Sequence, residues 1–183
     1  MEKFDQSNIR AIIAFVTAGW SSGSSLGSIA PFNIMNTKEK GDVAEQAAIF
    51  HALKRGWGVS RPIGDRLPYD LLFDLHGILV KIQVKCAWFD TNRQNWVTDN
   101  RRTKTNRRFM LRDRYSICDF DFALVYLPDH DIFYIFPVAV FIRYASEIHM
   151  VEANKRQRKP ESAIYRDAWD LIVQWAACRE TDV

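Results

Sequence analysis

Several features that define common protein classes are scarce in this chain of 183 residues. Its three cysteines, Cys86, Cys118 and Cys178, are odd in number and far apart, which argues against a disulfide framework and favours a cytoplasmic setting. The four histidines have no partner at the spacing of zinc ligands. Any metal ion should therefore be held by oxygen atoms.

Long apolar runs are missing as well. The apolar run Ala11 to Ala18 is far too short to span a bilayer, so we expect no membrane segment. A composition of 48% hydrophobic and 26% charged residues is that of a globular protein, and the length suits one domain.

The first 34 residues differ in composition from the rest of the chain. A Ser- and Gly-rich stretch at Ser21 to Ser28 predicts a flexible N-terminal extension. A signal peptide is disfavoured because Glu2 and Asp5 replace the usual basic start. Met35 is an alternative start, after which we expect a single domain over residues 35–183.

The net charge of +3 hides a local excess of basic residues between Thr91 and Arg114, where eight basic side chains face two acidic ones. Basic groups neutralise phosphates, and Arg, Gln and Asn read base edges. A merely solvated loop would usually mix the two signs more evenly. We therefore predict a DNA-binding loop or hairpin that uses Arg93, Gln94, Asn95, Arg101, Arg102, Lys104, Asn106, Arg107 and Arg108.

Regular elements follow from residue periodicity and end signals. Asn36 is a good N-cap with Glu39 three residues later, and Gly56 ends the helix. The pattern indicates an α/β or α+β fold in which helices flank a mixed β-sheet. The expected helices are Lys38–Arg55, Val138–Ala145 and Ser162–Ala177, and the expected strands are Gly58–Arg61, Asp70–Leu75, Ile78–Trp88, Phe120–Leu127 and Ile132–Pro137.

Four polar residues could build a catalytic site on these elements. Alternation along the strand Ile78–Trp88 puts Gln83 and Lys85 on one face, beside Asp70 at the start of the preceding strand. Cleaving a phosphodiester needs a hard cation held by oxygens and a positive group near the phosphate. Asp70 and Gln83 would bind the metal, Glu45 would hold a metal-bound water or a second ion, and Lys85 would orient the water or stabilise the phosphate.

Each of these residues also has an ordinary structural interpretation. Glu45 could be a solvated helix acid, and Asp70 could cap the turn after Pro68. Gln83 and Lys85 could form the outer row of an edge strand. Only their combination favours a nuclease site, and Gln83 predicts weaker metal binding because an amide carries no charge.

These residues carry a resemblance to the PD-(D/E)XK nuclease superfamily. The matching pieces are Glu45 in Lys40–Glu45, Asp70 after Pro68-Tyr69, and the run Gln83-Val84-Lys85. Within the superfamily, the chain from Met35 onward resembles the homing endonucleases encoded in cyanobacterial group I introns of an initiator tRNA gene, which also have Gln at this position. That subgroup match strengthens the nuclease interpretation.

The resemblance implies a restriction-endonuclease-like core and a site-specific endonuclease that cuts double-stranded DNA at a long target and promotes intron mobility. It implies Mg2+ as cofactor, with Mn2+ able to substitute, and a homotetramer. The apolar face of the last helix, with Trp169 and Trp175, is a candidate subunit contact. Two alternatives stay open: a Holliday-junction resolvase with the same core, and a non-catalytic DNA-binding relative in which Gln83 marks lost activity.

Overall fold

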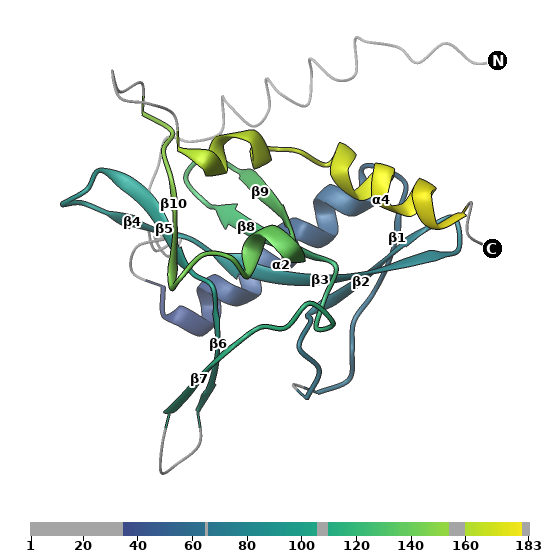
Figure 1. Cartoon of the computed structure of the whole chain (residues 1–183), viewed down its shortest axis with the longest axis horizontal. Helices are drawn as coiled ribbons and strands as arrows, with labels where there is room; N and C mark the ends of the chain where they lie inside the picture. Colours follow the sequence, from purple (N-terminus) through teal and green to yellow (C-terminus); the bar gives the residue numbers. More distant parts are fainter. Residues whose placement is uncertain (1–34, 65, 106–109, 154–159, 181–183) are drawn as a thin grey trace, which may run out of the picture. The chain divides into compact units, whose positions relative to one another are not determined.

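A mixed five-stranded β-sheet forms the centre of the computed structural model, which describes residues 35–64, 66–105, 110–153 and 160–180 (Figure 1). The expected N-terminal extension, residues 1–34, lies outside these ranges. The sheet has the order β1-β2-β3-β8-β9, in which β3 and β8 are parallel and all other neighbours antiparallel. Its strands are β1 (Gly58–Ser60), β2 (Leu71–Leu75), β3 (Ile78–Cys86), β8 (Phe122–Leu127) and β9 (Ile132–Pro137).

A smaller sheet and a separate hairpin complete the β structure. The smaller sheet has the order β10-β5-β4, and β6 pairs only with β7 among the described strands. These strands are β4 (Trp88–Asp90), β5 (Asn95–Asp99), β6 (Arg101–Thr105), β7 (Met110–Arg114) and β10 (Glu147–Met150). The helices are α2 (Thr37–Leu53), α3 (Val138–Phe141), the 3-10 helix η2 (Glu161–Tyr165) and α4 (Asp170–Glu180).

Strand β8 is buried on both faces, and its alternating side chains separate two apolar clusters. Phe122, Leu124 and Tyr126 pack in one cluster with residues of α2 and α4. Ala123 and Val125 pack in the other, which includes residues of β5, β10 and α3. The prediction of a mixed sheet flanked by helices is therefore confirmed.

Helix α2 is found where it is expected, but it begins one residue earlier and ends two residues earlier than the predicted Lys38–Arg55. The Asn36 side chain accepts hydrogen bonds from the backbone N–H of Lys38 and Glu39, each at 3.0 Å, and the Glu39 carboxylate accepts from Asn36 N at 2.9 Å. Gly56, at φ +77°, follows the helix. The fully buried Ala44 on this helix has so small a side chain that the backbone can lie close to the sheet. Helix α2 packs on β3, and Glu45 is the residue that directly follows Ala44 on this helix.

The expected helix Ser162–Ala177 is wrong over its first half. Only a short 3-10 turn precedes Arg166, which forms a β-bridge with Tyr134 of β9. Asp167, at φ +47°, donates its N–H to Phe133 O at 2.7 Å, and its carboxylate accepts from Phe133 N. The backbone of this segment is therefore hydrogen-bonded to the edge of β9, and the helix starts only at Asp170.

Two other elements are shorter than expected. The strand predicted as Ile78–Trp88 ends at Cys86, because Ala87 N donates to Tyr126 O and the chain then enters the smaller sheet. The helix predicted as Val138–Ala145 ends at Phe141.

Trp169 does not lie on an open helix face. It is 4% exposed, stacks on His51 at 5.7 Å between ring centroids and packs against Phe133. The expectation that Trp169 builds subunit contacts is therefore wrong, since it belongs to the core of its own chain. Within the described ranges, no helix is long and apolar enough to cross a membrane.

The cap of α2 gives a test of this local account. Asn36→Ala removes both hydrogen bonds of the Asn36 side chain and should destabilise the protein by about 1 kcal/mol. The thermal unfolding midpoint should fall by about 2–4 °C. Asn36→Asp keeps the acceptor and is the matched control; an equal loss for both variants would contradict the capping argument.

Candidate active site

All four residues predicted to carry chemistry line one cleft of about 500 Å³. Glu45 comes from α2, Asp70 from the segment before β2, and Gln83 and Lys85 from β3. The remaining lining residues are Thr37, Arg61, Pro62, Gly64, Leu67, Tyr69, Arg102 and Tyr115.

Asp70 is fixed where the pairing of β2 with β3 changes. Its backbone N–H donates to Ile82 O at 2.9 Å. Its carboxylate oxygen Oδ2 then accepts the backbone N–H of Val84 at 2.7 Å, a bond that a backbone carbonyl would make in a continued ladder. The carboxylate therefore lies directly against β3 and points into the cleft wall.

Gln83 is 8% exposed, and its amide contacts the same carboxylate. Nε2 donates to Asp70 Oδ2 at 2.5 Å and to Val84 O at 3.1 Å. A half-turn of the amide would exchange Nε2 and Oε1 and bring two oxygen donors side by side. Such a pair suits a divalent cation, whereas the orientation with Nε2 inward neutralises part of the Asp70 charge.

Glu45 faces the cleft from α2 and forms an ion pair with Arg61, which is hydrogen-bonded to its Oε2. Arg61 follows β1 and lines the same cleft. The Arg61 side chain is 49% exposed, so a phosphate could bind its guanidinium and a metal ion could take its place at Glu45.

Lys85 extends into the cleft from β3, two residues beyond Gln83. Its Nζ donates to Arg101 O at 3.0 Å and lies 5.2 Å from the centroid of the Tyr115 ring. The alternation predicted for β3 is thus observed, with Val80, Ile82 and Val84 in the apolar core and Gln83 and Lys85 at the cleft.

Burial shifts the protonation of these groups. It raises the pKa of Asp70, an effect that the Val84 N–H and Lys85 partly oppose. Burial, followed by the nearby Asp70 charge, raises the pKa of Glu45. Burial also lowers the pKa of Lys85, although Asp70 opposes this. The cleft therefore holds charges that are poorly solvated, as catalytic groups commonly are.

The donor set of the cleft fits a hard divalent cation. Glu45 and Asp70 supply carboxylate oxygens, and Gln83 can supply an amide oxygen. In the described part of the chain, no three His, Cys, Asp or Glu side chains gather as a metal site. With two carboxylates and an uncharged amide, binding should be weaker than in a three-carboxylate site.

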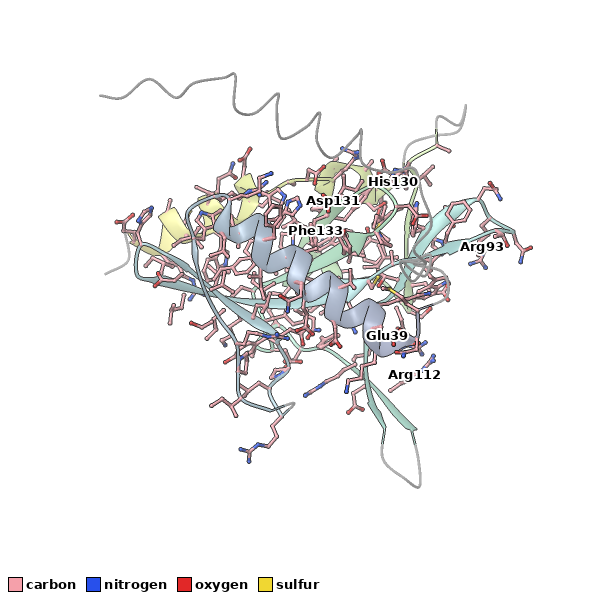
Figure 2. The ribbon with its side chains drawn as sticks, turned by 180° about the vertical axis from the view of Figure 1, so that it is seen from behind. Glu39, Arg93, Arg112, His130, Asp131 and Phe133 are labelled. Carbon is pink, nitrogen blue, oxygen red and sulfur yellow. The ribbon has the colours of Figure 1, made fainter. Side chains whose placement is uncertain are left out.

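The basic segment divides between two hairpins of different sheets. Arg93 and Gln94 lie in the turn between β4 and β5, and Asn95 begins β5. The Arg93 guanidinium contacts Glu147 and Asp90 at 3.5 and 3.8 Å. Figure 2 shows Arg93 on the β4–β5 hairpin, apart from Arg112 of the β6–β7 hairpin.

The β6–β7 hairpin, in contrast, reaches the cleft. Arg102 lines it and donates to the backbone carbonyls of Arg66 and Leu67 at 3.2 and 3.0 Å. Arg101 forms an ion pair with Asp99 at 3.1 Å. The backbone of Lys104 lies in β6, but its side chain and the residues Asn106, Arg107 and Arg108 lie outside the described part.

Sequence reasoning missed Arg61 and Tyr115 as cleft residues. Arg61 was assigned to a strand end, and only its spatial partner Glu45 reveals its place. Tyr115 directly follows the basic segment, and its position one residue after Arg114 was the available signal.

Comparison with known proteins agrees with this geometry. Residues 35–172 match the PD-(D/E)XK endonuclease family. The solved structure titled as a bacterial homing endonuclease, I-Ssp6803I, is 57% identical, covers 80% of this chain and 99% of its own, and superposes with a TM-score of 0.76. No protein of curated function matches significantly. The matched range contains every candidate catalytic residue, and the chain belongs to the PD-(D/E)XK endonuclease family.

Proposed function

We propose that the protein is a site-specific homing endonuclease that hydrolyses both strands of a long DNA target with Mg2+ and so promotes intron mobility. The observation that carries the proposal is the meeting of Glu45, Asp70, Gln83 and Lys85 in one cleft. The high identity to a homing endonuclease over nearly all of that protein's length supports the same substrate class.

Each candidate residue is assigned a role from its charge and its position in the cleft. Asp70, Gln83 Oε1 and Glu45 would hold the cation, which would supply an activated water and offset charge on the phosphate. Lys85 would orient that water or stabilise the scissile phosphate as negative charge builds on its oxygens. The water bonds to phosphorus and releases a proton to solvent, the P–O bond to the leaving strand end breaks, and the leaving oxygen takes up a proton.

Specific cutting is the direct test of the proposed function. Purified protein and Mg2+ should cut a plasmid that carries the intron-insertion region of the intronless allele at discrete positions. A preference for four-way junctions over this duplex would instead identify a junction resolvase. DNA binding that is insensitive to EDTA, with no cleavage in Mg2+ or Mn2+, would identify a non-catalytic relative.

Asp70→Asn separates metal binding from folding. The raised pKa of Asp70 means that its charged form disfavours the fold, so its contribution to stability is greatest below the ordinary pKa of 3.8 and is lost as the pH rises through the raised value. Asparagine cannot ionise, so in EDTA at pH 8 the variant should unfold at or above the wild-type temperature. Cleavage should fall by at least about 100-fold.

The matched control is Asp74→Asn on β2, the strand that follows Asp70, where the Asp74 side chain accepts a hydrogen bond from Gly77 N in the turn. Asp74→Asn should cut like wild type, and Mg2+ should raise its unfolding midpoint as it raises that of wild type. The same rise for Asp70→Asn would contradict the assignment of Asp70 as a ligand.

Gln83→Glu tests the uncharged ligand. It sets a second carboxylate against Asp70, so the metal-free protein should lose stability while the Mg2+ concentration for half-maximal cleavage falls by about tenfold. Thermal unfolding in EDTA and a Mg2+ titration of the cleavage rate measure the two effects. An unchanged Mg2+ requirement would show that Gln83 does not face the ion.

The proposed assembly is a homotetramer, as expected from the resemblance. Light scattering of the purified protein should give a mass near four times the 21.3 kDa chain. A monomeric mass at micromolar concentration would contradict the proposal. A dimeric mass would also contradict the tetramer, although a two-fold symmetric dimer could still cut both strands.

A further inference from the structure

Two residues at the base of the β6–β7 hairpin contact Lys85, the candidate catalytic lysine. Arg101, the first residue of β6, accepts a hydrogen bond from Lys85 Nζ through its backbone carbonyl at 3.0 Å. Tyr115, the residue after β7, presents its ring 5.2 Å from the same Nζ. Arg101 pairs with Arg114 at the open end of the hairpin, so both contacts come from its base.

The base itself is firmly held in the chain. Asn100, which precedes β6, is 5% exposed and donates through Nδ2 to Tyr144 O at 2.6 Å and to Phe141 O at 3.3 Å. Tyr115 is 6% exposed, with its ring 5.0 Å from that of Phe120. The lysine contacts therefore come from an ordered platform, not from a free loop.

The hairpin also bonds to the segment that precedes Asp70. Arg102 bonds to the carbonyls of Arg66 and Leu67, in the segment that leads from Arg61 to Asp70. Figure 1 shows the strands β6 and β7 extending beyond the five-stranded sheet, so DNA bound along them would act on a base that contacts both Lys85 and the segment before Asp70.

We propose that the base of the β6–β7 hairpin positions Lys85, with the Tyr115 ring as the positioning side chain. The inference rests on the proposed function of Lys85 and assigns Tyr115 a role in the rate of cleavage rather than in DNA affinity. A cation held over an aromatic face is attracted to it, and the attraction grows with desolvation. Tyr115 is buried and Lys85 is half-buried. The element expected to bind DNA thereby also sets the direction of the catalytic ammonium.

The test compares three variants under single-turnover conditions, with saturating enzyme and Mg2+ and well below every unfolding midpoint. Tyr115→Leu removes the ring, Tyr115→Phe keeps it, and Phe136→Leu is a matched lesion in the same apolar cluster. Phe136 contacts Tyr134, Phe141 and other rings of that cluster. Duplex affinity is measured separately with Ca2+ in place of Mg2+.

Tyr115→Leu should slow cleavage by about tenfold and leave the duplex Kd within about twofold of wild type. Tyr115→Phe should cut at the wild-type rate, and Phe136→Leu should unfold at a lower temperature but cut normally. If Tyr115→Leu does not fold, Tyr115→Met fills the space without a π face and should show the same slow cleavage.

Cleavage by Tyr115→Leu at the wild-type rate would overturn the proposal. An equal loss of cleavage rate in Tyr115→Leu and in either Tyr115→Phe or Phe136→Leu would also overturn it. Failure of the proposed function looks different. In that case wild type would not cut the target, or Lys85→Met would cut as well as wild type.

Discussion

The hydrogen bond from Val84 N to the carboxylate of Asp70 is the interaction on which the site depends. It replaces a backbone carbonyl with a side chain at the end of the β2–β3 ladder, so the carboxylate is held to the strand that carries Gln83 and Lys85. Parallel pairing of β3 with β8 buries the other row of β3 in the core and leaves this row at the cleft. The helix α2, capped at Asn36 and packed through alanines, then brings Glu45 to the same place.

Burial disfavours the charged forms of two groups in the site, and bound ligands would reduce this cost. Burial raises the pKa of Asp70 and lowers that of Lys85, so neither charge is well solvated without a partner. The Gln83 amide and the Arg61 guanidinium donate hydrogen bonds to the carboxylates of Asp70 and Glu45, respectively. In the proposed function, a cation and a DNA phosphate would be stronger partners, and exchange of these internal donors for the ligands would couple binding to assembly of the catalytic arrangement.

Much of this could be predicted from sequence because strong local signals carried it. The Asn36 capping box, the alternation of β3 and the His76-Gly77 turn identify α2 and the β2–β3 hairpin, and these elements hold Glu45, Asp70 and Lys85. The predictions that failed concern segments whose structure depends on residues distant in the sequence. The helix expected from Ser162 yields to Arg166 and Asp167 because the edge of β9 binds their backbone. Arg61 and Tyr115 enter the cleft only through tertiary packing, which no local pattern encodes.

In the proposed site, Asp70 and Gln83 would bind a divalent cation beside Lys85, and Glu45 would hold a metal-bound water or a second ion. Anomalous diffraction from crystals grown with Mn2+ and a target duplex tests it most directly, because the ion is identified by its own scattering. The account predicts an anomalous peak in contact with the Asp70 carboxylate and with Gln83 Oε1, after the half-turn of the amide. A peak that contacts neither residue, or Gln83 Nε2 still bonded to Asp70 in the loaded cleft, would contradict it.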